Sequence, residues 1–459
     1  MAPRARGTSS VRRAPPSAHG AYAAAVQLER PSATTQPLRA RIARRDVLLG
    51  LASGLTALVA ACAPAPSLSP ASSAPEPVRS ASAPDTAAPP SSSAPSASSS
   101  AAAASSAPSV TPAPSTVDEL AHRVAGLLIV GFRGMRLADA PWIRTAIARD
   151  ALGGVILFDR DQLTGRARNV MSPSQVAALT AELHATAGSG QGLLIGVDQE
   201  GGIVTRLGPS HGFPAVASEA TVGAGTVAGA RTWARTIAGT VASSGCNLDF
   251  APVVDLDVNP QNPAIGALGR SFSADPDVVA RMAGIELDAL RLAGVHAAAK
   301  HFPGIGSATV NTDFGVADVT KTWTRTELEP YRRLAAAGKL DAVMVGHVVN
   351  GQLDPKRPAS LSKPTLDLLR GDIGFDGPAV TDDLQAAAIT QRFGADEAVL
   401  LALEAGNDLL LFANQQVYDP GIVRHVVGIV LAAVAHGRLT GDQIDRAWTR
   451  RQAMLGLPS

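Results

Sequence analysis

The sequence predicts a single (β/α)8 barrel over residues 116–459, preceded by a disordered N-terminal tether. Two observations predict this fold. Short apolar runs alternate with longer stretches of helical pattern, and the runs are apolar on both faces, as in a parallel sheet covered on both sides. There are eight such runs, the number of strands that closes this kind of barrel. An open, doubly wound sheet is the alternative interpretation.

The eight expected strands share an apolar centre and a polar or glycine boundary. In chain order they are GLLIVGF (126–132), GGVILF (153–158), GLLIGVD (192–198), CNLDFAPVVD (246–255), GVHAAAKHF (294–302), LDAVMVGHV (340–348), GPAVTDDL (377–384) and NDLLLF (407–412).

Helical patterns fill the segments between these runs. Thr324 and Glu327 have the spacing of a capping box, which supports a helix start at that point. The last part of the chain, 421–455, is expected to add helices to the outside of the barrel. The clearest helical segments between strands are 173–186, 228–243, 276–293, 324–337 and 396–405.

Residues 1–62 are interpreted as an N-terminal extension that ends in an export signal. Arg44 and Arg45 precede an apolar stretch, 47–61, which is too short to span a bilayer comfortably and is typical of a signal peptide. The twin arginines resemble a twin-arginine signal, and VAAC resembles a bacterial lipobox ending at Cys62. We therefore expect lipidation at Cys62, with the lipid as the only membrane contact, on the outer face of a bacterial cytoplasmic membrane. An uncleaved anchor or a buried helix is the alternative.

Residues 63–115 consist mainly of Ala, Ser and Pro. Such a segment has too few large apolar side chains to bury a core, so it is expected to be a disordered linker. The other cysteine, Cys246, lies at the start of an expected strand and is expected to be a small buried side chain. The two cysteines imply no disulfide framework.

Overall charge excludes some partners. The chain has 40 Lys and Arg against 39 Asp and Glu, so it has no basic field that would attract nucleic acid. Aromatic residues make up only 4%, which argues against long stacking surfaces for sugars or single strands.

Polar residues gather at the carboxyl ends of the expected strands. In a barrel these ends meet at one rim, so residues far apart in the sequence would share one pocket. Taken singly, each could instead be a helix cap or a surface loop residue. They are Asp198, Gln199, Glu200, Asp249, Asp255, Lys300, His301, His347, Asp382 and Asp383.

Carboxylates beside cations suit glycoside hydrolysis, in which one carboxylate attacks and another group moves the proton. The sequence lacks His and carboxylate ligands at metal spacing, a GxSxG elbow, a P-loop and a dinucleotide fingerprint. It therefore predicts no cofactor and no metal site.

Six motifs, in order, resemble glycoside hydrolase family 3, and the similarity is greatest to its NagZ-type β-N-acetylglucosaminidases. The resemblance covers about residues 116–455. The motifs are VDQEGGIVTRLG (197–208), NLDFAPVVD (247–255), GRSFSADP (269–276), KHFPGIG (300–306), VMVGHVV (343–349) and GFDGPAVTDDL (374–384).

This resemblance implies a retaining exo-enzyme that releases terminal N-acetylglucosamine from cell-wall fragments. It implies that Asp382 is the nucleophile and forms a covalent glycosyl intermediate. Asp383 is expected to point away or to cap the next helix, and Phe302–Pro303 is a candidate cis peptide bond. The implied sugar-binding residues are Asp198, Arg206, Arg270, Lys300 and His301.

One loop departs from the family pattern. Relatives of the NagZ type carry Asp-Ser-His where this chain has Asn311, Thr312 and Asp313. We interpret Asp313 as the proton donor, with Asn311 as an uncharged hydrogen-bonding neighbour. Such an acid needs a raised pKa, and an acidic activity optimum is expected. Gly304, Gly306 and Gly315 suggest a mobile loop that closes on the substrate.

Three alternatives to this activity remain at the sequence level. The chain could be a β-glycosidase of another specificity within the same family. It could transfer the sugar to phosphate, although a carboxylate at residue 313 would repel that anion. It could also be a catalytically impaired sugar-binding lipoprotein that keeps Asp382 without a working proton donor.

Overall fold

A computed structural model of the chain describes residues 116–188 and 190–458. The predicted signal peptide, the lipobox at Cys62 and the linker at 63–115 lie outside the described residues. Within the described part, no helix is both long enough and apolar enough to cross a membrane. Cys246 is buried there, as expected.

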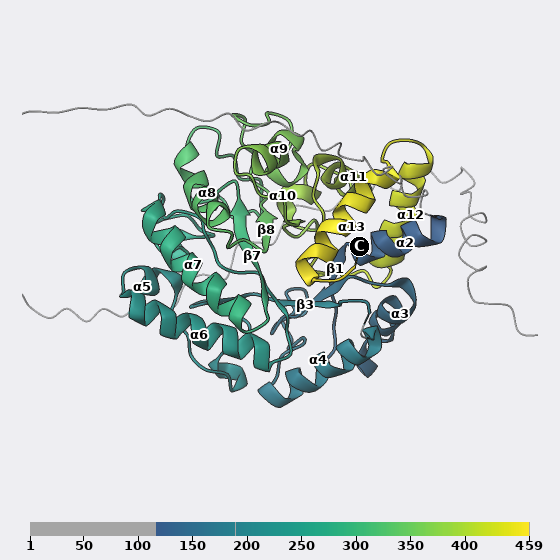
Figure 1. The fold of residues 1–459 in the computed structure, drawn as a ribbon, viewed down its shortest axis with the longest axis horizontal. Coiled ribbons are helices and arrows are strands. Elements are labelled where there is room, and N and C mark those ends of the chain that lie inside the picture. The colour runs from purple at the N-terminus through teal and green to yellow at the C-terminus, as the bar shows by residue number, and fades with distance from the viewer. Residues whose placement is uncertain (1–115, 189, 459) are drawn as a thin grey trace, which may run out of the picture. The chain divides into compact units, whose positions relative to one another are not determined.

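Eight parallel strands form one sheet in the order β10-β1-β2-β3-β6-β7-β8-β9, enclosed by helices (Figure 1). A parallel bridge between Val380 and Leu409 joins the two edges, so the sheet curls into a nearly closed barrel. The prediction of a single barrel is therefore confirmed, and the open sheet is wrong. The strands are β1 (Leu128–Gly131), β2 (Gly154–Ile156), β3 (Leu194–Val197), β6 (Leu248–Asp249), β7 (His296–Phe302), β8 (Ala342–Val345), β9 (Ala379–Thr381) and β10 (Leu410–Phe412).

Each of these strands lies inside one of the eight expected runs, and almost every strand residue is buried. The reason is the two-sided cover: the helices pack on the outer face, and side chains fill the barrel interior. A separate antiparallel hairpin, β4 (Gln199–Gly201) and β5 (Val204–Thr205), extends the chain beyond β3.

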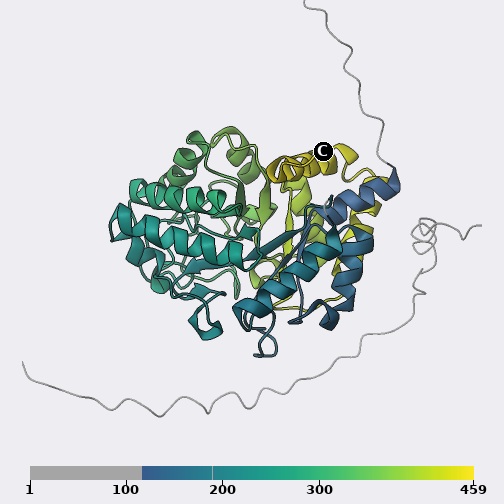
Figure 2. The same ribbon diagram turned by 60° about the horizontal axis from the view of Figure 1, so that its bottom comes forward.

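The helices surround the sheet, as the turned view shows (Figure 2). Four predicted helices are confirmed to within one residue at each end: α4 (Pro173–Ala187), α6 (Val227–Ser243), α7 (Pro276–Leu292) and α11 (Ala395–Ala405). The other helices are α2 (Val117–Gly126), α3 (Pro141–Asp150), α5 (Glu219–Gly223), α8 (Glu329–Ala336), α9 (Lys363–Gly371), α10 (Ala387–Thr390), α12 (Ile422–Ala435) and α13 (Gly441–Leu455). Short 3-10 turns are η2 (Leu137–Asp139), η3 (Pro209–His211), η4 (Gly266–Leu268), η5 (Arg325–Leu328) and η6 (Ala359–Leu361).

The capping box predicted at Thr324 and Glu327 is wrong. The segment begins there as η5, but the Thr324 side chain makes no capping hydrogen bond. The carboxylate of Glu327 is buried instead and accepts a 3.0 Å hydrogen bond from the amide of Gly306. Burial, together with the charge of Asp255, raises the pKa of Glu327 to about 7. Glu327 therefore holds the loop after β7 rather than starting a helix.

The last two helices pack on the outside of the barrel, as expected, and α13 also closes its amino end. The guanidinium of Arg451 is fully buried and donates to the carbonyl oxygens of Gly153 (3.1 Å) and Gly192 (2.8 Å), just before β2 and β3. The carboxyl ends of the strands lie at the opposite end, where the long loops leave a cavity.

The buried carboxyl group of Glu286 should make the stability of the fold depend on pH. Glu286 on α7 is fully buried, and neither of its side-chain oxygens has a hydrogen-bond partner among the described residues. Burial, and next the charge of Asp249, raises the pKa of Glu286 well above its usual value.

We expect Glu286→Gln to reduce the loss of stability at high pH. Above its normal pKa the unfolded chain releases the Glu286 proton while the folded chain keeps it, so folding becomes less favourable as pH rises. The variant cannot ionise, and its Tm should fall by roughly 2–5 °C less than wild type between about pH 5 and about pH 8. Thermal denaturation followed by circular dichroism measures this, with the exposed Asp118→Asn as the matched control. Identical pH dependence in Glu286→Gln and wild type would contradict it.

Candidate active site

A cavity of about 200 Å³ opens at the carboxyl ends of the barrel strands. This is smaller than the roughly 300–1,000 Å³ typical of sites for drug-sized ligands, so it suits a single small ring. It brings together every residue that the sequence assigned to catalysis or sugar binding. These are Asp198, Arg206, Arg270, Lys300, His301, Asp313 and Asp382.

Glu200 organises the cationic side of the cavity. Both its oxygens accept from the Arg270 guanidinium, at 2.7 Å each, and its Oε1 lies 2.6 Å from Lys300 Nζ. Burial of Glu200 opposes its charge, but the two cations outweigh this and hold its pKa well below its usual range. The sequence placed Glu200 at a strand end but did not assign it a role. Its position three residues beyond β3 was the only signal.

Asp198 forms the second anchor. Its Oδ1 accepts from Lys300 Nζ at 3.1 Å, and its Oδ2 accepts from Arg206 Nη2 at 3.3 Å. Burial opposes ionisation, yet Lys300 and Arg206 lower the pKa of Asp198 below its usual value. Lys300 Nζ thus contacts one oxygen of Asp198 and one oxygen of Glu200, which leaves one of its three N–H donors for a ligand hydroxyl.

His301 is oriented from behind by Asp255. Its Nδ1 lies 2.6 Å from Asp255 Oδ2, and the same carboxylate accepts from the amides of His301 and Ile305. Since a carboxylate accepts, Nδ1 carries a proton, which fixes how the ring presents itself to the cavity. Asp255 thus has a positioning role that the sequence did not predict.

Four of the strand-end residues expected in the pocket do not line it: Gln199, Asp249, Asp255 and His347. The Gln199 side chain is hydrogen-bonded to the backbone of Leu207 instead. Asp255 lies behind His301, and Asp249 accepts from the amide of Gln199 at 3.0 Å. His347 is buried between the Ser360 hydroxyl (2.7 Å) and the carbonyl oxygen of Asp383 (2.8 Å). Each of these side chains forms hydrogen bonds with polar groups of the loops, because buried backbone donors and acceptors need partners.

Asp382 follows β9 directly and faces the cavity. Its backbone N–H donates to Val345 of β8 at 3.0 Å, and its Oδ1 accepts from the amide of Asp383 at 2.8 Å. The Asp383 carboxylate turns instead to the loop after β10, accepting from the amides of Gln385 and Ala413. Burial raises the pKa of Asp383 to about 7. Of the two placements expected for Asp383, pointing away or capping the next helix, the second is not observed, because the N-cap of α10 is Ala386.

Asp313 reaches the same cavity from the loop after β7, residues 303–324, named here the β7 loop. Its amide donates to Asn311 Oδ1 at 2.9 Å, so Asn311 is the uncharged partner that the sequence suggested. Burial, and next the charge of Asp382, raises the pKa of Asp313. A raised pKa is what a carboxylic acid needs in order to remain a proton donor.

The β7 loop is docked on the segment that follows Asp382. The first two amides of α10 donate to the carbonyl oxygens of Asp313 (3.2 Å) and Thr312 (3.1 Å). Gln416 Nε2 donates to the same Asp313 oxygen at 2.7 Å. One short stretch of chain therefore fixes both carboxylates relative to each other.

Two of the three loop glycines serve close packing rather than freedom alone. Gly304 has φ +110°, a conformation that side-chain-bearing residues rarely adopt, and a Cβ there would lie 2.6 Å from Cβ of Glu327. A Cβ at Gly306 would lie 1.9 Å from the carbonyl oxygen of Leu256. The Phe302–Pro303 bond is cis, as expected. Lys300–His301 and Ala251–Pro252 are cis as well.

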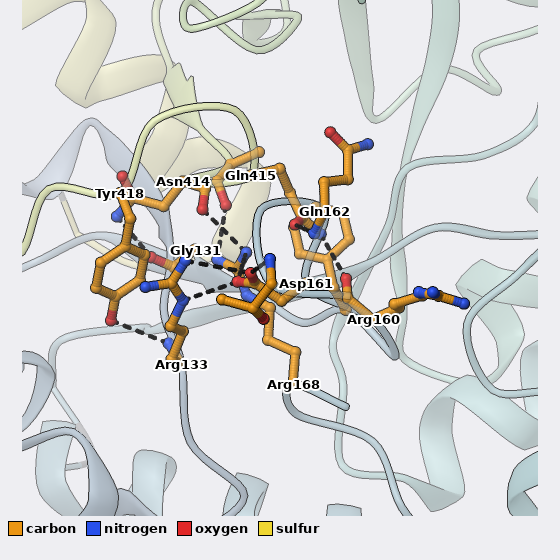
Figure 3. Close-up of polar contacts among 12 residues, drawn as sticks. Gly131, Arg133, Arg160, Asp161, Gln162, Arg168, Asn414, Gln415 and Tyr418 are labelled. Atoms are coloured by element: carbon orange, nitrogen blue, oxygen red, sulfur yellow. Dashed lines mark hydrogen bonds and ion pairs between the residues drawn. The ribbon is translucent and has the colours of Figure 1, made fainter. Parts of the chain in front are cut away.

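A buried ionic network ties two further loops to the rim (Figure 3). Arg168, fully buried, donates to the carbonyl oxygens of Ala413 (2.8 Å) and Asn414 (3.0 Å), and it pairs with Asp161. Gln415 then joins the loops: it donates to the carbonyl of Arg160 and accepts from the amide of Gln162 (Figure 3). The cavity wall that Gln162 and Gln415 contribute is thereby held in place.

The chemistry available here rests on carboxylates and cations. The described residues contain no group of three or more His, Cys, Asp or Glu side chains that could hold a metal ion. Asp382 and Asp313 both line one cavity; among residues 116–188 and 190–458 no cation pairs with Asp382, and the pKa of Asp313 is raised. Such a pair can supply one nucleophile or base and one acid.

Comparisons with known proteins find similarity over most of the part of the chain that the structure describes. The family model described as "Glycosyl hydrolase family 3 N terminal domain" matches residues 119–454. The protein "Beta-hexosaminidase LpqI" of Mycobacterium tuberculosis is 33% identical over 342 residues, covering 73% of this chain and 82% of that one.

Two solved structures are also similar. A β-N-acetylhexosaminidase from Beutenbergia cavernae has 32% identity and a TM-score of 0.66, with 74% of this chain and 98% of that one covered. A glycoside hydrolase family 3 β-N-acetylglucosaminidase from Paenibacillus has 35% identity and a TM-score of 0.66, with 74% of this chain covered. This chain spans only 64% of the Paenibacillus protein.

Proposed function

The chain belongs to glycosyl hydrolase family 3, and from this we propose that it is a retaining exo-β-N-acetylhexosaminidase releasing terminal N-acetylglucosamine. The observation that carries the proposal is the small cavity in which Asp382 and Asp313 meet a fixed set of cations. The names of the similar proteins support the choice of an N-acetylhexosamine among sugars.

Asp382 is the proposed nucleophile. Its carboxylate attacks the anomeric carbon, the bond to the leaving oxygen breaks, and a covalent glycosyl ester forms. Asp313, protonated at the start, gives its proton to that leaving oxygen. It then takes a proton from the water that hydrolyses the ester, so the two displacements together retain the configuration.

The cations hold the ring for these steps. Lys300 and Arg206, each already fixed by Asp198, direct their remaining N–H groups at ring hydroxyls, and His301 is fixed by Asp255. Donors fixed in advance orient the anomeric carbon toward Asp382 without further ordering on binding.

The natural substrates are proposed to be peptidoglycan-derived fragments. The predicted export signal and lipobox at Cys62 support this, because a lipoprotein on the outer face of the cytoplasmic membrane meets cell-wall glycans.

Hydrolysis of 4-nitrophenyl N-acetyl-β-glucosaminide tests the activity, and proton NMR of the first product tests the stereochemistry. We expect rapid release of 4-nitrophenol and early appearance of the β-anomer of N-acetylglucosamine, which then mutarotates. The 4-nitrophenyl β-glucoside is the matched substrate and should react far more slowly. An α-anomer as first product would exclude the double displacement, and no hydrolysis at all would exclude the activity.

A further inference from the structure

Exposed apolar side chains are concentrated in the loops at the end of the barrel where the active-site cavity opens. Of the ten large apolar side chains that are exposed within residues 116–188 and 190–458, seven lie in loops that follow the carboxyl ends of barrel strands. The other three, Val117, Val227 and Leu292, stand at the first or last residue of a helix. Single exposed apolar residues are ordinary, but a concentration at one rim marks a contact surface.

Five of the seven are immediate sequence neighbours of residues that line the cavity. They come from the loops after β2, β3, β7 and β10, all at the carboxyl ends of the barrel strands. We name this set the apolar rim: Leu163, Ile203, Val310, Phe314 and Val417.

Phe314 is the largest member and adjoins the proposed proton donor. Its side chain is 69% exposed although it follows Asp313 directly, and its amide is held by the carbonyl oxygen of Asn311 at 3.1 Å. An aromatic ring on a docked loop, beside a polar cavity, is not explained by core packing. An apolar surface placed there gains free energy only when something covers it.

The size of the cavity indicates which group would cover this apolar surface. At about 200 Å³ it takes one sugar ring, so the group joined to that ring through the scissile bond must lie outside, at the mouth. Asp313 has to reach the oxygen of that bond, and Phe314 is next to it in the chain. The rim is therefore continuous with the proposed reaction centre.

We propose that the apolar rim is the binding subsite for the leaving group, with Phe314 as its main contact. The ligand it takes is an alcohol with an apolar face, such as the C–H face of a second pyranose ring. The inference rests on the proposed hydrolase function and extends it to substrate selection. Covering Phe314 also stabilises the docked position of Asp313, which couples recognition of the leaving group to protonation.

A series of alkyl N-acetyl-β-glucosaminides tests the subsite, because methyl, butyl and cyclohexylmethyl alcohols leave with similar ease but differ in apolar area. Wild-type kcat/KM should rise along the series. In Phe314→Ala the loss should deepen with size, from about twofold on the methyl glycoside to about tenfold on the cyclohexylmethyl glycoside. Inhibition by free N-acetylglucosamine, which occupies only the cavity, should change little by comparison.

Leu292→Ala is the matched control, since Leu292 is exposed at the end of α7, on the opposite side of the barrel from the cavity. It should leave the whole series unchanged, while Ile203→Ser should reproduce the size-dependent loss. An equal loss on every alkyl glycoside would overturn the subsite and leave Phe314 with an effect on Asp313 alone. Size dependence unchanged in Phe314→Ala, with binding to phosphatidylglycerol vesicles lost instead, would assign the rim to a bilayer. No hydrolysis by wild type would refute the hydrolase function, a result distinct from either.

Discussion

Replacing Asp382 with Ala is expected to lower kcat on 4-nitrophenyl N-acetyl-β-glucosaminide by roughly four to six orders of magnitude. The variant keeps the cavity and its cations but has no atom that can form the glycosyl ester. KM should change far less than kcat, because the proposed sugar-binding residues Asp198, Lys300 and Arg206 are held by contacts with one another that do not involve residue 382. Steady-state release of 4-nitrophenol measures both constants.

Added azide sharpens this test. Azide can enter the space of the missing carboxylate, attack the anomeric carbon from the side that Asp382 used and displace 4-nitrophenolate. The product is then the α-glycosyl azide, formed with a single inversion, which proton NMR distinguishes from the β-azide. The matched control is Asp383→Asn, whose side-chain oxygen can still accept from Gln385 and Ala413. Its loss should stay below about tenfold. Substantial turnover by Asp382→Ala without azide would remove Asp382 as the nucleophile.

The barrel and the placement of Asp382 could be predicted because they depend on local pattern. Eight apolar runs of strand length predict the eight strands of the sheet. The last residues of each run lie at the rim of the barrel, whatever the conformation of the loops. Asp382, Lys300 and His301 occupy such positions or lie in the last residues of a strand. Their convergence follows from topology alone.

The partners of these residues could not be predicted in the same way. Glu200 was visible at a strand end, but its bidentate contact with Arg270 depends on how two long loops fold over each other. Glu327 matched a local capping rule, but its carboxylate accepts instead from the buried amide of Gly306, 21 residues away. Arg168 reaches a carbonyl 245 residues away, which no local pattern encodes.

Asp313 lies between these two cases. The sequence showed a carboxylate where NagZ-type relatives have histidine, but whether it reaches the cavity depends on the docking of the β7 loop. The amides of Ala387 and Ala388 and the side chain of Gln416 supply that docking, and none of them is marked in the sequence. The structure also gives Asp313 a raised pKa, and this leads to the second prediction.

Asp313→Asn is expected to lower activity much more on substrates with a poor leaving group than on substrates with a good one. On an N-acetylglucosamine disaccharide, whose leaving alcohol needs a proton, kcat/KM should fall by about 10²–10⁴-fold. On the 4-nitrophenyl glycoside kcat/KM should fall by less than about tenfold, because that phenolate leaves unaided. Without the base, the glycosyl ester should accumulate, so kcat and KM on this substrate should fall together. Azide should then attack the ester and give the β-azide, the opposite anomer from the Asp382→Ala reaction.

The pH profile provides an independent check on the same carboxyl. Asp313 must be protonated to donate, so activity on the disaccharide should be lost as pH rises through its raised pKa, on the basic side of the optimum. The optimum should be more acidic than that of a relative with a histidine donor. In Asp313→Asn this basic limb should vanish, leaving a low, flat activity.

Asn311→Asp is the matched variant for the electrostatic cause. An Asp can still accept the amide of Asp313, but its charge should disfavour ionisation of that carboxyl and raise its pKa further. The basic limb should therefore move to higher pH. A basic limb that persists unchanged in Asp313→Asn would show that another group donates the proton. The arrangement of Asn311, Asp313 and Asp382 would then explain the geometry of the cavity but not its chemistry.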